Sequence, residues 1–250
     1  MSAPAPQLAA VDLWNRLGAF SRDDGVELDR IIWQLRKLAV RYPADFVTRS
    51  ALARALLMRG RRGEALPHVD AAFALRYGQE WDATNNLAGI LLDCGRLRES
   101  EDILTRLLNS SGAVGSDSLY ETSIRFSLRK GDFSFLKKAI HSTRIECGNT
   151  NEIIVLVERG FLAESLRKHQ KIVESVLGSL TCTFGAKAFH DSEGVLCVSL
   201  EYYTERTGRP RLELYRQLAL AKLHEELVGL SPHLVIGICG PQVQPLENAE

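Results

Sequence analysis

The order of large apolar, small and glycine residues repeats along the first half of the chain. The segment 52–60, with the sequence LARALLMRG, returns 35 residues later as LAGILLDCG at 87–95. Glycines that end or separate such segments stand at positions 25, 60, 95 and 131. Apolar residues spaced three and four apart flank these glycines, a pattern typical of amphipathic helices joined by a tight turn. The sequence therefore predicts about four helical hairpins stacked as an all-α solenoid over residues 9–148.

The apolar pattern changes after residue 148. Four short runs rich in β-branched and aromatic residues predict strands, at 152–157, 180–189, 195–203 and 234–239. Amphipathic helices are expected over 160–177 and 210–230. The order β-α-β-β-α-β is that of ferredoxin-like folds, so a small α/β domain is expected over 149–240. In an alternative interpretation, 151–159 is the first helix of a fifth repeat. The fold class is thus α+β, with mobile tails at 1–8 and 241–250.

The helical half resembles the tetratricopeptide repeat (TPR) family. That family carries W-x-x-L-G in the first helix of each unit and A-x-x-x-F in the second. Trp14, Leu17 and Gly18 match the first motif, and Ala65 with Val69 follows the spacing of the second. The resemblance covers about residues 9–147. It implies a right-handed solenoid whose first helices line a concave groove that binds a peptide or a helix of another protein.

The resemblance also implies which side chains would line that groove. They are Asn15, Ser50, Arg54, Asp82, Asn85, Asn86, Glu121 and Arg125. Among them, Arg54, Asn85, Asn86 and Arg125 would hold an extended peptide through its backbone and its acidic side chains. Some family members grip a C-terminal carboxylate with lysines, and these lysines have no counterpart here. The competing interpretation of each residue is a solvated polar face.

Two classes of function follow. The first is a protein–protein interaction adaptor, chaperone or regulatory subunit that binds its partner in the groove. The second is an α/β domain that senses a small ligand or binds RNA, with the repeats used for recruitment. The open face of the predicted sheet would carry Thr183 and Tyr203 among others. We expect this face to pack against the repeats or against a second copy, which would make a homodimer.

The balance of charges and the motifs of the sequence disfavour several classes of function. Lysine plus arginine and aspartate plus glutamate number 31 each, so nothing favours a nucleic-acid partner. Five cysteines without a C-x-x-C pair indicate reduced thiols and a cytoplasmic location. We expect no signal peptide and no membrane partner, because the apolar runs are short. The histidines are scattered and no catalytic motif is present, so we expect no enzyme, no cofactor and no metal site.

Overall fold

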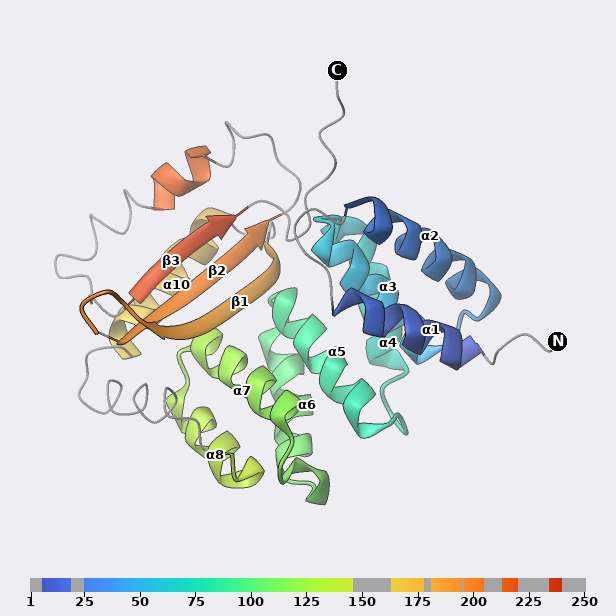
Figure 1. The fold of residues 1–250 in the computed structure, drawn as a ribbon, viewed down its shortest axis with the longest axis horizontal. Coiled ribbons are helices and arrows are strands. Elements are labelled where there is room, and N and C mark those ends of the chain that lie inside the picture. Colours follow the sequence, from blue (N-terminus) through green and yellow to red (C-terminus); the bar gives the residue numbers. More distant parts are fainter. Residues whose placement is uncertain are drawn as a thin grey trace.

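A computed structural model describes residues 6–18, 25–145, 163–177, 181–194, 196–204, 213–219 and 234–239. The described chain is mostly helical, with a small sheet near its C-terminal end (Figure 1). Its helices are α1 Pro6–Leu17, α2 Gly25–Arg41, α3 Phe46–Met58, α4 Arg62–Ala74, α5 Trp81–Asp93, α6 Leu97–Leu108, α7 Asp117–Lys130, α8 Phe133–Thr143 and α10 Ala163–Leu177. A short 3₁₀ helix, η1, covers Ser111–Ala113. The α+β class and the helical repeats are confirmed, and α1 begins inside the predicted tail.

Successive helices form hairpins closed by the glycines of the repeat pattern. The pairs α3–α4, α5–α6 and α7–α8 pack against each other. Gly60, Gly95 and Gly131 have φ angles of 72°, 77° and 66°, in the left-handed region that glycine adopts without a steric cost. After α3, the N–H of Arg61 reaches back to the carbonyl of Leu56 at 2.8 Å, which satisfies a helix-end acceptor. The regular spacing of these glycines therefore sets the hairpin length.

Small apolar residues lie where paired helices approach closely, and large apolar residues fill the space between helices. Ala53 and Ala88 are fully buried, so the paired helices approach closely at these positions. Leu28, Ile31 and Leu35 form the buried stripe of α2. One apolar core runs through α1 to α8.

A second apolar core joins the last hairpin to the sheet. Leu128 of α7 and Leu136 of α8 pack there with Val173 of α10 and with Leu200 and Tyr202 of the sheet. All five side chains are at most 1% exposed. The hairpin α7–α8 therefore belongs to both halves of the molecule.

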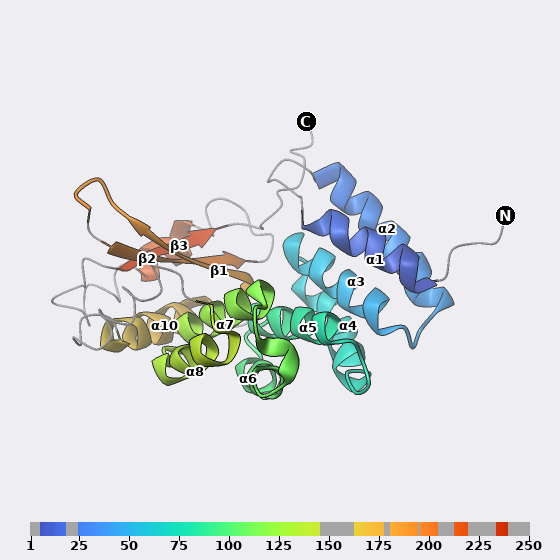
Figure 2. The same cartoon turned by 60° about the horizontal axis from the view of Figure 1, so that its bottom comes forward.

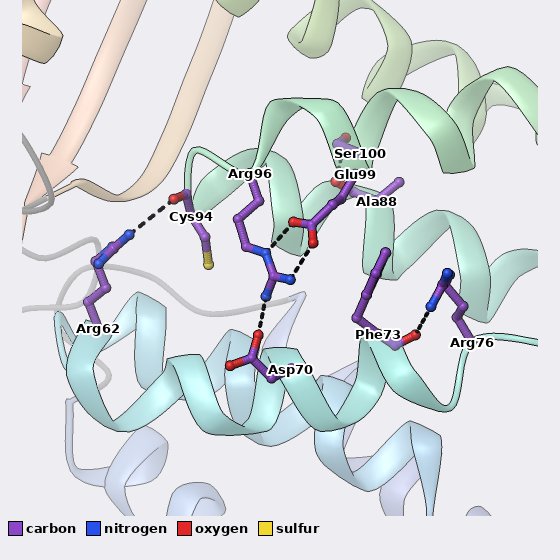
Figure 3. Close-up of polar contacts among 9 residues, drawn as sticks. All are labelled: Arg62, Asp70, Phe73, Arg76, Ala88, Cys94, Arg96, Glu99 and Ser100. Carbon is purple, nitrogen blue, oxygen red and sulfur yellow. Dashed lines mark hydrogen bonds and ion pairs between the residues drawn. The ribbon is translucent and has the colours of Figure 1, made fainter.

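Polar contacts fix neighbouring hairpins to each other. Arg96 donates to Asp70 of α4 at 2.5 Å and pairs with Glu99 of α6 (Figure 3). Ser100 donates to the carbonyl of Ala88 at 2.9 Å, so α6 is tied directly to α5. Because Arg96 contacts both α4 and α6, it fixes the spacing between the hairpins α3–α4 and α5–α6.

The sheet has three strands in the described part of the chain, β1 Thr181–His190, β2 Leu196–Thr204 and β3 Leu234–Cys239, in the order β1-β2-β3. β1 and β2 form an antiparallel hairpin, as predicted, and β3 runs parallel to β2. α10 lies against one face of the sheet in both views (Figures 1 and 2).

The sheet differs from the expected ferredoxin-like arrangement. In a split βαβ unit, another strand separates the two parallel strands. Here β2 and β3 pair directly, from Val198–Leu234 to Tyr203–Cys239. The expected strand at 152–157 and the alternative fifth-repeat helix at 151–159 lie outside the described residues. Within the predicted helix 210–230, residues 213–219 are helical and the others are not described.

No helix in the described ranges combines the length and the apolar character needed to cross a membrane.

Candidate functional site

A cavity of about 380 Å³ lies where the inner helices meet the sheet. α3, α5 and α7 supply its helical walls, and β1 and β2 supply the opposite wall. Figure 1 shows the ends of α5 and α7 beside β1. This cavity is the candidate site, and below it is called the groove cavity.

Helical periodicity brings the lining residues together. Asn85, Gly89 and Asp93 stand four residues apart on α5, so they share one face of that helix. Ser118 and Thr122 have the same spacing on α7. Each helix therefore contributes a row of side chains that runs along the cavity rather than a single contact.

Arg54 of α3 brings a positive charge into the cavity. Its guanidinium stacks over the ring of Trp14 at 4.8 Å. Burial lowers the pKa of Arg54, and nearby Arg125 lowers it further, while Asp93 opposes both effects. The side chain stays charged, because arginine does not lose its proton in proteins. Among the described residues, Arg54 has no hydrogen bond and no carboxylate within 4.0 Å. Within the described part of the chain it is therefore a partly buried cation with no carboxylate in direct contact.

Arg125 lies nearby but is already engaged. It forms an ion pair with Asp93 and donates to the backbone carbonyl of Phe184 in β1. Asp93 in turn accepts the backbone N–H of Phe184 at 3.1 Å. Arg129 lies over the Phe184 ring at 5.1 Å from its centroid. The backbone of one residue of β1, Phe184, is thus held at both its N–H and its carbonyl, which fixes the sheet at this end of the groove.

Two buried polar atoms in the wall have no partner in the described part of the structure. Asn85 is 2% exposed and donates through Nδ2 to Ser118 Oγ at 2.7 Å, but its Oδ1 accepts no bond. Thr183 of β1 is 5% exposed, and its Oγ1 is also without a partner. A buried acceptor without a donor costs about 1–3 kcal/mol. Both atoms are buried within the wall, so Arg54 is the cation without a partner that the described residues leave at the cavity itself.

The sequence-based groove residues separate into two sets. Arg54, Asn85, Asn86, Glu121 and Arg125 line the groove cavity together. Ser50 is 3% exposed and lies outside the lining, and Asn15 and Asp82 are exposed and also outside it. That the five lining residues bind a peptide stays a prediction.

Sequence reasoning missed several wall residues. Asp93 follows Gly89 by one helical turn on α5, so helical spacing alone was a usable signal for it. The sequence predicts Thr183 and Tyr203 on the open face of the sheet, and that face meets the repeats here. Nothing in the sequence indicates that Phe184 docks on Asp93, because the two residues are 91 positions apart.

No group of three histidine, cysteine or acidic side chains that would hold a metal ion occurs among the residues described. Comparisons with known family models, with curated proteins and with solved structures gave no match to this chain.

Proposed function

We propose that this protein is a TPR-like interaction module of the cytoplasm, an adaptor or regulatory subunit without catalytic activity. Its groove cavity would receive an extended, acidic segment of a partner protein. The observation that carries the proposal is Arg54, a partly buried guanidinium without a counterion among the described residues. Protein interiors rarely leave such a charge unpaired, because desolvation is costly without a compensating contact.

The charges around the cavity favour an acidic ligand group. Arg125 is neutralised by Asp93, so Arg54 is the cation that remains available within the described walls. A carboxylate from a partner would pair with it and gain about 1.5–3 kcal/mol from a charge-assisted hydrogen bond. That corresponds to roughly 10- to 150-fold in affinity.

A charge-removal pair tests this proposal. The Arg54→Gln variant keeps most of the side-chain stem and loses the charge. Arg98→Gln, at an exposed position of α6 outside the cavity, is the matched control. Affinity purification with the full chain, analysed by mass spectrometry, should recover the same partner with wild type and Arg98→Gln. Arg54→Gln should lose it without a lower melting temperature. Equal recovery by both variants would refute the proposal.

A second candidate function is sensing of a small ligand, and one observation favours it. Thr183 and Tyr203 make the sheet a wall of the cavity, so a ligand there would contact both halves of the molecule. A ligand that bridges two structural units stabilises both of them by mass action. A thermal-shift screen with amino acids and nucleotides tests this: a saturable rise in melting temperature, abolished by Arg54→Gln, is the expected result.

A further inference from the structure

The hairpin α1–α2 carries an open, largely apolar groove, below called the end groove. It has a volume of about 600 Å³ and lies between the two helices. Leu8, Ala9 and Leu13 of α1 and Leu38 of α2 supply its apolar lining, and none of its described lining residues belongs to α3. Both views place this hairpin at the end of the helical array away from the sheet (Figures 1 and 2). The described helices thus leave the end groove uncovered.

The same hairpin exposes more apolar surface than a terminal repeat normally does. Stacked helical repeats bury the face that one hairpin presents to the next, and terminal repeats carry polar outer faces that keep the array soluble. Of the ten large apolar side chains that are exposed among the described residues, five lie on α1 and α2. Three of them, Val26, Trp33 and Val40, follow one another at intervals of seven residues, so they form one exposed ridge along α2. Exposed apolar surface that gathers in one place marks an interface.

The charges of the end groove indicate which partner fits it. Three charged side chains line the groove, Asp12 and Arg16 from α1 and Lys37 from α2. Arg16 forms an ion pair with Glu27. Asp12 and Lys37 are exposed, and neither forms an ion pair within 4.0 Å with a described residue. The Lys37 ammonium group lies over the Trp33 ring, 3.4 Å from its centroid. One carboxylate and one ammonium group therefore remain available, on opposite walls of the groove.

A second copy of this chain matches that arrangement. A purely acidic partner surface would repel Asp12, and a purely basic one would repel Lys37. In a two-fold dimer, residue i of one copy meets residue j of the other, and residue j meets residue i in turn. When α1 of one copy lies against α2 of the other, each Asp12 meets a Lys37 and the exposed Leu8 is covered. The end groove is thus complementary to itself in both charge and apolar character.

We propose that the end groove and the ridge on α2 form the interface of a homodimer with two-fold symmetry. Asp12 of each copy forms an ion pair with Lys37 of the other. Leu8 and Leu38 pack in the joined grooves, and the ridge at Trp33 is covered beside them. The sheet is not part of this interface, and none of the described residues lines both the end groove and the groove cavity. The dimer goes beyond the proposed function and does not depend on it.

Exchange of charges between the two walls tests the dimer. Sedimentation equilibrium of the full chain over roughly 1–100 μM measures its mass and its dimer dissociation constant. Asp12→Lys and Lys37→Asp each turn both ion pairs of the dimer into like-charge contacts. Leu8→Glu places a carboxylate in the apolar part of the groove. Asp102→Lys, at a carboxylate of α6 that is 63% exposed, is the matched control, and circular dichroism verifies that each variant is folded.

The expected result is a wild-type particle with twice the mass of the chain. The dimer dissociation constant should rise at least tenfold in Asp12→Lys, in Lys37→Asp and in Leu8→Glu, and Asp102→Lys should stay within twofold of wild type. An equimolar mixture of the Asp12→Lys and Lys37→Asp proteins should form a heterodimer, because both ion pairs then form with their charges exchanged. The double variant Asp12→Lys/Lys37→Asp should recover the homodimer for the same reason.

A wild type that stays monomeric at the highest concentration would leave the end groove to another segment of the chain or to a different protein, and would overturn the inference. A dimer that Leu8→Glu and both charge variants leave unchanged would have its interface elsewhere, with the same consequence. Loss of the dimer in both charge variants without recovery in their mixture would refute the pairing of Asp12 with Lys37. The proposed function depends on Arg54, which does not line the end groove, so either proposal can fail without the other.

Discussion

Replacement of Asp93 by asparagine should loosen the attachment of the sheet to the repeats. Asp93 joins the sheet to the repeats directly. Its carboxylate accepts the N–H of Phe184 in β1 at 3.1 Å and forms an ion pair with Arg125 of α7. Asparagine is nearly the same size, so no cavity opens and the change isolates the charge. Arg125 then stays bonded to the carbonyl of Phe184 without a counterion.

The expected loss follows from the burial of the two partners. The side chain of Asp93 is 15% exposed and that of Arg125 is 29% exposed, so the pair lies between a surface and a buried ion pair. A hydrogen bond to a charged group contributes about 1.5–3 kcal/mol. An exposed ion pair contributes up to about 1 kcal/mol, and breaking a fully buried one costs about 3–5 kcal/mol. We therefore expect a loss of roughly 2–4 kcal/mol, or a fall of roughly 4–16 °C in melting temperature for a chain of this size.

Differential scanning calorimetry and hydrogen exchange together test this prediction. The amides of β1 and β2 should exchange faster in the variant, whereas those of α3 and α4 should change less. Asp102→Asn is the control, since that carboxylate is 63% exposed and pairs with Arg106 at 3.7 Å. A melting temperature within 2 °C of wild type, with unchanged exchange in β1, would refute the claim that Asp93 holds the sheet.

Three further predictions concern single residues. Burial and nearby arginines lower the pKa of His68, so its protonation favours the unfolded chain. Stability should therefore fall as the pH drops below about 6.5, and His68→Gln should flatten this dependence in pH-dependent melts. Burial, with a neighbouring carboxylate, raises the pKa of Cys94 to about 12, so iodoacetamide at pH 8 should label it in urea but not in the native protein. Gly131→Ala should cost about 1–2 kcal/mol in urea unfolding, because φ is 66° and the new Cβ would lie 2.8 Å from Arg167. The control Gly63→Ala should instead be neutral or slightly stabilising.

Local chemistry explains why the repeats were predictable from the sequence. A turn that needs a positive φ favours glycine, and Gly60, Gly95 and Gly131 mark three such turns directly. A close helix contact needs a small residue, and Ala53 and Ala88 mark two of these contacts. Each requirement involves residues near one another in the chain. The hairpin β1–β2 was predictable for the same reason, since its two strands are adjacent in sequence.

Contacts between distant segments were not predictable in this way. The direct pairing of β2 with β3 depends on how the intervening chain crosses over, which a pattern of apolar residues does not encode. The candidate site was found only in part for a related reason. Helical spacing places Arg54 and Asn85 on inner faces, but Thr183 reaches the same cavity through the docking of Phe184 on Asp93.

The position of the hairpin α7–α8 has a consequence for the length of the solenoid. Repeat proteins of this kind are extended by stacking another unit on the last one, and they end where a unit covers its outer face. Here the sheet and α10 cover α7 and α8, with Leu128 and Leu136 buried beneath them. Among the described residues, the sheet and α10 therefore cover the hairpin α7–α8 as the end of an array would be covered. A fragment ending after α8 would expose this apolar surface and aggregate.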